Sequence, residues 1–229
     1  MRDIKENSVS AVGQMVNSSE LSFLGNEDGK KRILVVGNSI TRHGPLKEIG
    51  WENDWGMAAS APEKDFVHRL YAKLQQSGQD VYMRIRQCAF WERNYRKEDI
   101  LTHYEEEKAF GADVVVFRLG ENVVEEDKPY FKEALRAFIS HICPSTGKTI
   151  FTTCFWKNEI IDEAVLAVAK ERGEVCLDGY FAKDDVNMAL NQFEHRGVAM
   201  HPSDEGMEAI AECIFKAVIQ HLENMDKNL

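Results

Sequence analysis

The sequence predicts an α/β domain with three layers, α/β/α, around a five-stranded parallel sheet. Two observations predict it: short apolar runs rich in β-branched residues, and segments of helical periodicity that lie between them. Residues 31–229 are long enough to bury a sizeable core as one domain. Residues 1–30 are polar and irregular, and we interpret them as an N-terminal extension.

The predicted strands are short runs that are mostly apolar. The first, Ile33–Gly37, is continuous and rich in β-branched residues, which is typical of a strand buried on both faces of a parallel sheet. The other four are Val81–Gln87, Val114–Leu119, Thr149–Phe155 and Glu174–Leu177. Because helical segments separate them, we expect parallel pairing through right-handed crossovers.

Helices are predicted where apolar residues recur three and four positions apart. The segments with this spacing are Asp65–Gln76, Tyr130–Ile142 and Asn158–Glu171. A fourth amphipathic stretch, Ala209–Leu222, follows Ser203, which is a good N-cap residue.

Two polar residues lie at positions where an α/β sheet can use them for chemistry. Ser39 follows Gly37 just past the carboxyl end of the first strand, the edge at which open α/β sheets bind ligands. The alternative interpretation is a turn whose Ser merely caps the following segment. His201 lies in a loop directly before the last helix. A Ser and a His placed in this way form a candidate nucleophile and base.

These segments resemble the motifs of the SGNH (GDSL-type) hydrolase family. Gly37-Asn-Ser-Ile-Thr41 resembles the family's first motif, Gly-Asp-Ser-x-Thr, with Asn in place of Asp. Gly120-Glu-Asn122 resembles its third motif, Gly-x-Asn, and His201-Pro202 followed by Gly206 resembles its last. The resemblance covers roughly residues 31–224 and implies a flavodoxin-like strand order and a serine esterase.

The usual acid of the family's catalytic triad is absent from its usual place. Three residues before the His, where the family has Asp, this chain has Val198. Three acidic residues lie nearby in the sequence: Glu194, Asp204 and Glu205. A backbone carbonyl is the other candidate for orienting His201, and it would leave a Ser–His dyad.

The resemblance also implies an oxyanion hole, which holds the negative oxygen formed when Ser39 attacks an ester carbonyl. Its predicted donors are the Ser39 backbone N–H, the Asn122 side-chain amide and the Ala89 backbone N–H. Ala89 stands where the family has Gly, and its N–H can donate if Ala can adopt the local backbone conformation. Asn122 has an alternative role in closing an Asx turn.

Aromatic residues near the strand ends are candidates for binding the substrate. Two lie in the long connection Arg42–Glu63, and long connections with their own aromatic residues tend to be functional. The candidates are Trp51, Trp55, Phe90, Trp91 and Trp156. Aromatic platforms suit sugar rings, and many members of the family deacylate carbohydrates. The alternative is that Trp51 and Trp55 only pack the connection onto the domain.

Composition restricts the other functions that the chain can have. A net charge of −10 argues against nucleic acid as a partner. We expect no metal site and no cofactor, because no His or Cys residues have ligand spacing and no phosphate-binding glycine motif is present. No apolar run has the length of a membrane span, and no export signal is recognisable. Together with five cysteines that lack a CxxC spacing, this favours a cytoplasmic protein.

Two functions follow from these residues. The first is a serine esterase or deacylase that hydrolyses small acyl esters, with acetylated carbohydrate as the expected substrate. The second is a catalytically weak or inactive protein of the same fold that binds a carbohydrate or an acyl ligand. Val198 and Ala89, at positions where the family has Asp and Gly, favour the second. The sequence does not predict an oligomeric state.

Overall fold

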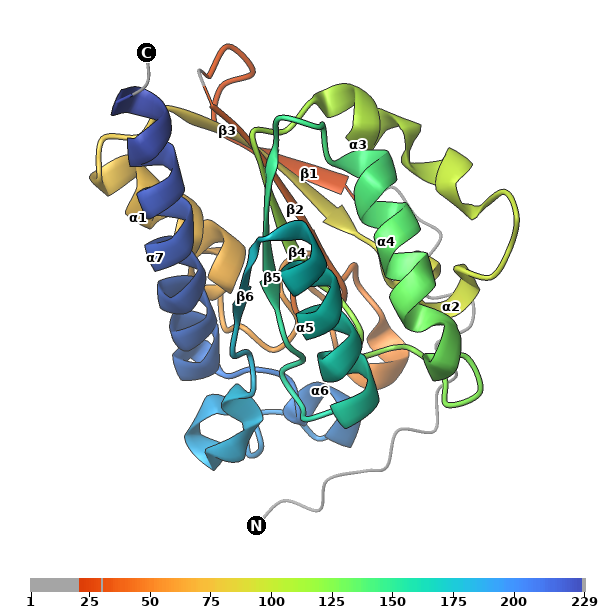
Figure 1. Cartoon of the computed structure of the whole chain (residues 1–229). Coiled ribbons are helices and arrows are strands. Elements are labelled where there is room, and N and C mark those ends of the chain that lie inside the picture. The colour runs from red at the N-terminus through yellow and green to blue at the C-terminus, as the bar shows by residue number, and fades with distance from the viewer. Residues whose placement is uncertain (1–20, 30, 228–229) are drawn as a thin grey trace.

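A computed structural model describes residues 21–29 and 31–227 and contains a six-stranded sheet in the order β1-β3-β2-β4-β5-β6 (Figure 1). The strands are β1 (Leu21–Leu24), β2 (Lys31–Gly37), β3 (Val81–Gln87), β4 (Val114–Arg118), β5 (Lys148–Thr152) and β6 (Val175–Leu177). Strands β2 to β6 are parallel, which confirms the predicted parallel sheet. Their order is the flavodoxin-like one that the family resemblance implied.

The sixth strand corrects the prediction of a five-stranded sheet. Leu21–Leu24 pairs antiparallel with β3 at the sheet edge, inside the segment interpreted as an irregular extension. Phe23 stacks on Tyr82 with ring centroids 5.4 Å apart and lies under the guanidinium of Arg84. A four-residue edge strand between polar segments has too little apolar pattern to be recognised from sequence. Of the predicted extension, residues 1–20 and residue 30 lie outside the described residues.

The predicted helices form with their ends shifted by a few residues. The helices are α1 (Phe66–Gln76), α2 (Ala89–Asn94), α3 (Glu105–Phe110), α4 (Phe131–Ile142), α5 (Glu159–Arg172), α6 (Arg196–Ala199) and α7 (Asp204–Lys227). Short 3-10 helices occupy Lys47–Ile49, Pro62–Lys64, Ile100–Tyr104, Lys128–Tyr130, Phe181–Lys183 and Asp185–Asn187. The hydroxyl of Ser203 accepts the Gly206 N–H at 3.1 Å, so Ser203 caps α7 as predicted.

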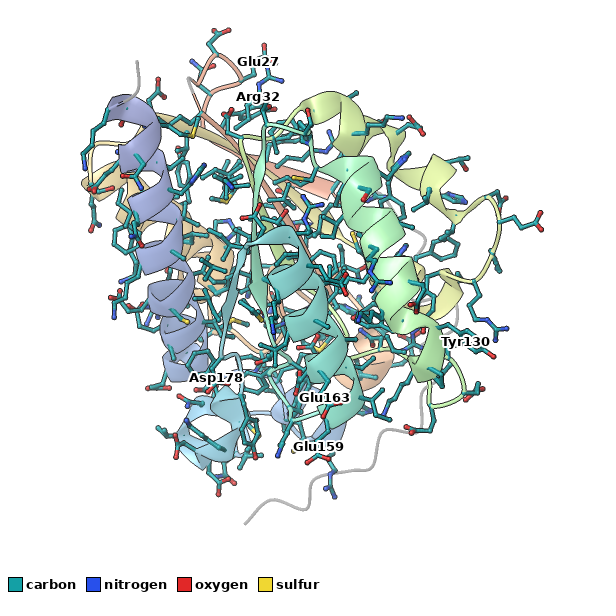
Figure 2. All side chains as sticks on the ribbon, viewed as in Figure 1. Glu27, Arg32, Tyr130, Glu159, Glu163 and Asp178 are labelled. Carbon is teal, nitrogen blue, oxygen red and sulfur yellow. The ribbon has the colours of Figure 1, made fainter. Side chains whose placement is uncertain are left out.

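Helices cover both faces of the sheet. Helices α1 and α7 pack together on one face, and α4 and α5 lie side by side on the other (Figure 1). Residues Ile33–Val36 of β2 are fully buried because both faces of this strand are covered. Figure 2 shows the side chains that fill the space between the layers, with Glu27 and Glu163 on the outside. Within residues 21–29 and 31–227, no helix has both the length and the apolar character needed to span a membrane.

The carboxyl ends of the parallel strands meet at the edge of the sheet that is lowest in Figure 1. The turn after β2 folds back tightly at this edge. A Cβ atom at Gly37 would lie 1.8 Å from Thr41 Oγ1, so only glycine allows the turn to approach the strand end this closely. The turn therefore presents Ser39 at the edge where α6 and the start of α7 also lie.

Candidate active site

Ser39 and His201, 162 positions apart in the sequence, are in hydrogen-bond contact. Ser39 Oγ lies 2.7 Å from His201 Nε2, and His201 Nδ1 lies 2.6 Å from the carbonyl oxygen of Gly197. A carbonyl oxygen can only accept, so Nδ1 carries the ring proton and Nε2 is free to accept from the Ser39 hydroxyl. A serine and a histidine in this arrangement can act as a nucleophile and its general base.

A backbone carbonyl, and not an acidic side chain, orients the base. Val198 is fully buried in a small apolar cluster, so the usual position of the triad acid belongs to the core. Asp204 binds the Ser60 backbone N–H and hydroxyl, and Lys64. Among the alternatives that the sequence left open, the group at His201 Nδ1 is the Gly197 carbonyl, so the structure has a Ser–His dyad.

Backbone hydrogen bonds hold both members of the dyad. The Ser39 carbonyl accepts the N–H of Met57 at 2.9 Å, which anchors the long β2–α1 connection to the nucleophile turn. The His201 N–H donates to the Val198 carbonyl, and the His201 carbonyl accepts the N–H of Ala189, each at 2.9 Å. The loop between α6 and α7 is thus fixed on both sides of the histidine.

The surroundings of His201 favour its neutral form. Burial lowers the pKa of His201 to about 3, and the Gly197 carbonyl opposes this only in part. His43, Arg118 and His195 also disfavour a positive charge on the ring. The imidazole is therefore unprotonated over the physiological pH range, as a general base must be.

Apart from the Ser39 N–H, the two predicted oxyanion donors are the groups of Asn122 and Ala89, and each has a hydrogen-bond partner within the protein. Asn122 Nδ2 donates to Glu92 Oε2 at 2.6 Å, and Asn122 Oδ1 accepts from Arg93 Nη2 at 3.2 Å. An amide nitrogen carries two hydrogens, so one remains to serve an oxyanion. The Ala89 N–H donates to Gln87 Oε1 at 3.0 Å, so this donor is occupied by the protein itself.

The side-chain amide of Asn38, the residue before Ser39, joins two carboxylates whose side chains are almost fully buried, Glu92 and Glu121. Asn38 Nδ2 donates to Glu121 Oε2 at 2.6 Å and to Glu92 Oε1 at 3.2 Å. Glu121 also accepts from Arg118 Nη2 at 2.8 Å and from the Phe155 N–H at 3.0 Å. The Asn at position 38 thus provides the N–H donor that an Asp could not.

Two of the predicted substrate-binding residues belong to the core, which corrects that prediction. Trp51 and Trp91 are fully buried. Trp51 donates its Nε1–H to the His43 carbonyl at 3.0 Å, and Trp91 stacks on Phe138 with ring centroids 4.6 Å apart. An aromatic residue near a strand end fits a core as well as a cleft, and sequence does not distinguish the two.

The other three aromatic candidates are only partly buried. Trp55 donates to the Ala59 carbonyl at 2.9 Å within the long connection, and its ring packs against the apolar cluster between the sheet and α1 and α7. Phe90 packs edge-on against His103 with centroids 5.3 Å apart. Trp156 lies edge-on to the His201 ring at 5.4 Å, and its buried Nε1 has no hydrogen-bond partner. Of the five candidates, Trp156 is the one in ring contact with the dyad histidine.

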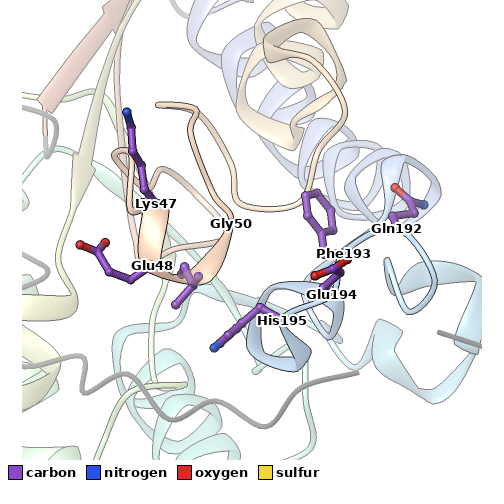
Figure 3. A pocket seen from close by; sticks show the side chains of 8 residues that line it. Lys47, Glu48, Gly50, Gln192, Phe193, Glu194 and His195 are labelled. Atoms are coloured by element: carbon purple, nitrogen blue, oxygen red, sulfur yellow. The ribbon is translucent and has the colours of Figure 1, made fainter. Parts of the chain in front are cut away.

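A cavity of about 410 Å³ lies between the Lys47–Ile49 turn and the segment before α6 (Figure 3). Its lining includes Lys47, Glu48, Phe193 and His195, and Figure 3 shows His195 directed toward the Lys47–Gly50 segment. Both ring nitrogens of His195 are buried without a hydrogen-bond partner.

Within residues 21–29 and 31–227, no cluster of His, Cys, Asp and Glu side chains could hold a metal ion.

No family model and no curated protein matches the chain. A mutant of Axe2, an acetyl-xylooligosaccharide esterase from Geobacillus, matches with a TM-score of 0.54, 16% identity, and coverage of 85% of this chain and 95% of that one. The chain has the SGNH hydrolase fold. A lipase/acylhydrolase from Enterococcus faecalis matches with a TM-score of 0.53, 16% identity, and coverage of 81% and 94%. A Bacteroides ovatus protein described as a GDSL-like lipase matches at 0.52, 13% identity, and coverage of 83% and 98%.

The sequence predicted no role for Glu92 in holding the site together, and it indicated a backbone carbonyl as a candidate for orienting His201 without identifying Gly197. Glu92 carried a signal, because it follows a predicted strand within the segment aligned with the family's second motif. The Gly197 carbonyl carried none, since any residue has a carbonyl and only the turn geometry directs it at His201.

Proposed function

We propose that the chain is a serine esterase or deacylase that acts on small acyl esters, with acetylated carbohydrate as its substrate class. The observation that carries the proposal is the 2.7 Å contact between Ser39 Oγ and His201 Nε2, with the ring proton placed on Nδ1 by Gly197. One structural neighbour is an acetyl-xylooligosaccharide esterase, which supports the choice of substrate class.

The geometry supports a two-step reaction. Ser39 Oγ attacks the ester carbonyl while His201 Nε2 takes the hydroxyl proton, and His201 then gives this proton to the leaving alcohol. Water repeats the sequence on the acyl-serine, which releases the acid and restores the hydroxyl. The free hydrogen on Asn122 Nδ2 and the Ser39 backbone N–H are the proposed donors to the oxyanion. Ala89 can join them only if the Gln87 side chain moves away.

A catalytically weak protein that binds a carbohydrate or acyl ligand is the second candidate. The observation that favours it is the occupied Ala89 N–H, which leaves one predicted oxyanion donor unavailable. The absence of a carboxylate on His201 Nδ1 agrees with it, because a carbonyl stabilises an imidazolium less than a carboxylate does.

Labelling with a fluorophosphonate distinguishes the two candidates. An activated serine displaces fluoride and forms a covalent phosphonate, which intact-mass analysis detects. We expect one adduct on the native protein and none on Ser39→Ala or His201→Ala. No adduct on folded native protein would favour the binding protein. An adduct that persists in Ser39→Ala would place the nucleophile elsewhere.

The substrate class needs a separate measurement. We expect acetate release from acetylated xylo-oligosaccharides and a lower rate with long-chain acyl esters of the same alcohol. Faster hydrolysis of the long-chain esters would overturn the choice of acetylated carbohydrate while leaving the esterase itself in place.

A further inference from the structure

We propose that Glu92 is a positioning residue of this site: its buried carboxylate holds the Asn122 amide as an oxyanion donor and ties it to the turn that carries Ser39. This inference rests on the proposed esterase function. Glu92 lies on α2, directly after β3, and is fully buried.

The carboxylate of Glu92 joins its own helix, α2, to two other segments of the chain, the turn after β2 and the turn after β4. It accepts from Asn122 Nδ2 at 2.6 Å, from the Gly120 N–H at 2.5 Å and from Asn38 Nδ2 at 3.2 Å. Asn38 precedes the nucleophile, while Gly120 and Asn122 follow β4. An ionised carboxylate has only acceptors, so it matches three N–H donors without conflict.

Glu92 also decides which atom of the Asn122 amide is the donor. The ionised carboxylate requires Nδ2 at its end, and the guanidinium of Arg93 requires Oδ1 at the other. Because Glu92 fixes Nδ2 and Arg93 fixes Oδ1, the amide plane of Asn122 cannot rotate, and the second N–H bond on Nδ2 has a fixed direction. Preorganised donors of this kind lower a barrier because they need no rearrangement when charge develops.

Protonation of Glu92 would break this arrangement. A protonated carboxyl places an O–H among three N–H donors, so the group loses acceptor capacity and releases the Asn122 amide. Loss of the fixed amide orientation should lower the turnover rate and leave the binding of substrate nearly unchanged.

Burial and the neighbouring charge of Glu121 bring the protonation of Glu92 near neutral pH. Burial and the charge of Glu121 raise the pKa of Glu92 to about 7, although its three hydrogen bonds act in the opposite direction. Glu121 is itself paired with Arg118, and Arg93 reaches the network only through Asn122. The thiol of Cys154 is also near, and burial raises its pKa, so it stays uncharged. We therefore assign the acid limb of the activity profile to Glu92 and not to His201.

The test measures kcat and KM from about pH 5 to about pH 9 for the native protein, Glu92→Gln and Glu107→Gln. Glu107 is the matched control, since it is a buried carboxylate on α3 that pairs with Arg84 of β3. We expect native kcat to fall below about pH 7. Glu92→Gln should lower kcat at pH 8 by about 10- to 100-fold, keep KM within about twofold, and remove the acid limb. Glu107→Gln should keep the native limb.

The outcomes separate this inference from the proposed function. If the native protein neither labels with fluorophosphonate nor hydrolyses acetyl esters, the proposed function fails. If the native protein is active and Glu92→Gln keeps native kcat or the native acid limb, the inference on Glu92 is overturned.

A second variant covers the case in which Glu92→Gln does not fold. Asn122→Ala removes the group through which Glu92 acts, so its residual activity should show no acid limb near pH 7. An unchanged limb in Asn122→Ala would also overturn the inference.

Discussion

His201 Nδ1 lies 2.6 Å from the carbonyl oxygen of Gly197, so the candidate base takes its orientation from a residue four positions earlier in the same turn. Most Ser–His sites add a carboxylate from a separate part of the chain. Here the position where the SGNH family has that acid holds Val198, which packs in an apolar cluster with Trp51 and Ile49.

Placing the family's usual acid at this position should damage the protein. Val198→Asp would bury a carboxylate among apolar side chains, and we expect it to lower the free energy of unfolding by roughly 2 to 5 kcal/mol. Urea denaturation measures this loss, with Val198→Thr as a control of similar shape. A stable Val198→Asp protein with raised kcat would show that the position still accepts a triad acid.

The two members of the dyad should act as a unit. We expect Ser39→Ala and His201→Ala each to lower kcat by about 10⁴-fold or more, and the double variant to be no slower than either single one. Steady-state hydrolysis of an acetyl ester measures this. Additive losses would mean that the two residues act independently.

Asn122 should contribute to the transition state more than to substrate binding. We expect Asn122→Ala to lower kcat by about 10²- to 10³-fold with little change in KM. Asn94→Ala is the control, because Asn94 also donates its side-chain amide, at 2.8 Å, but to the Phe90 carbonyl within α2 and not to the Glu92 carboxylate. Equal losses in both variants would argue for a general effect on folding.

Trp91 and Trp156 should respond differently to substitution. Trp91→Ala empties a fully buried aromatic cluster, so we expect a loss of about 3 to 5 kcal/mol in the free energy of unfolding. Trp156→Ala should leave stability closer to native and raise KM, since the ring lies at His201 and its Nε1–H is unpaired. Denaturation and steady-state kinetics on both variants check this. A native KM in Trp156→Ala would show that Trp156 does not contribute to substrate binding.

His201 should make the stability of the fold depend on pH. Its pKa is about 3 in the folded protein, against an ordinary value of 6.5. Between these values the unfolded chain binds a proton that the folded chain does not, so the stabilisation present above pH 6.5 is lost as the pH falls toward 3. The difference in unfolding free energy between native protein and His201→Gln should therefore shrink over that range. Both proteins retain Glu92, whose raised pKa has the opposite effect and largely cancels in the difference. A difference that stays constant with pH would contradict the lowered pKa.

Local patterns were sufficient to predict the five parallel strands and the motif residues. The run from Ile33 to Val36 indicated a doubly buried strand, and the structure buries all four residues. The placement of Ser39 after that strand and of His201 before α7 also followed from short stretches of sequence. Edge strand β1 was missed, because its stability comes from pairing with β3 and not from its own pattern.

Side-chain roles at the strand ends were harder to predict. Trp51 and Trp91 resembled substrate platforms in sequence, yet each fills a gap in the core. Glu92 lies in the same segment as Trp91 and turns instead toward the site. Adjacent residues on an α-helix point about 100° apart around its axis, and only the packing of the helix shows which of them faces the apolar core.

The sequence by itself determined the five parallel strands, the α/β class and the placement of Ser39 after β2 and of His201 before α7, because periodicity and turn chemistry are local properties. The tertiary structure decided which group orients His201, which donors stay free and which carboxylates the Asn38 amide joins. Those relationships join residues such as Asn38, Glu92 and Asn122 across three segments, and burial makes each hydrogen bond depend on its neighbours.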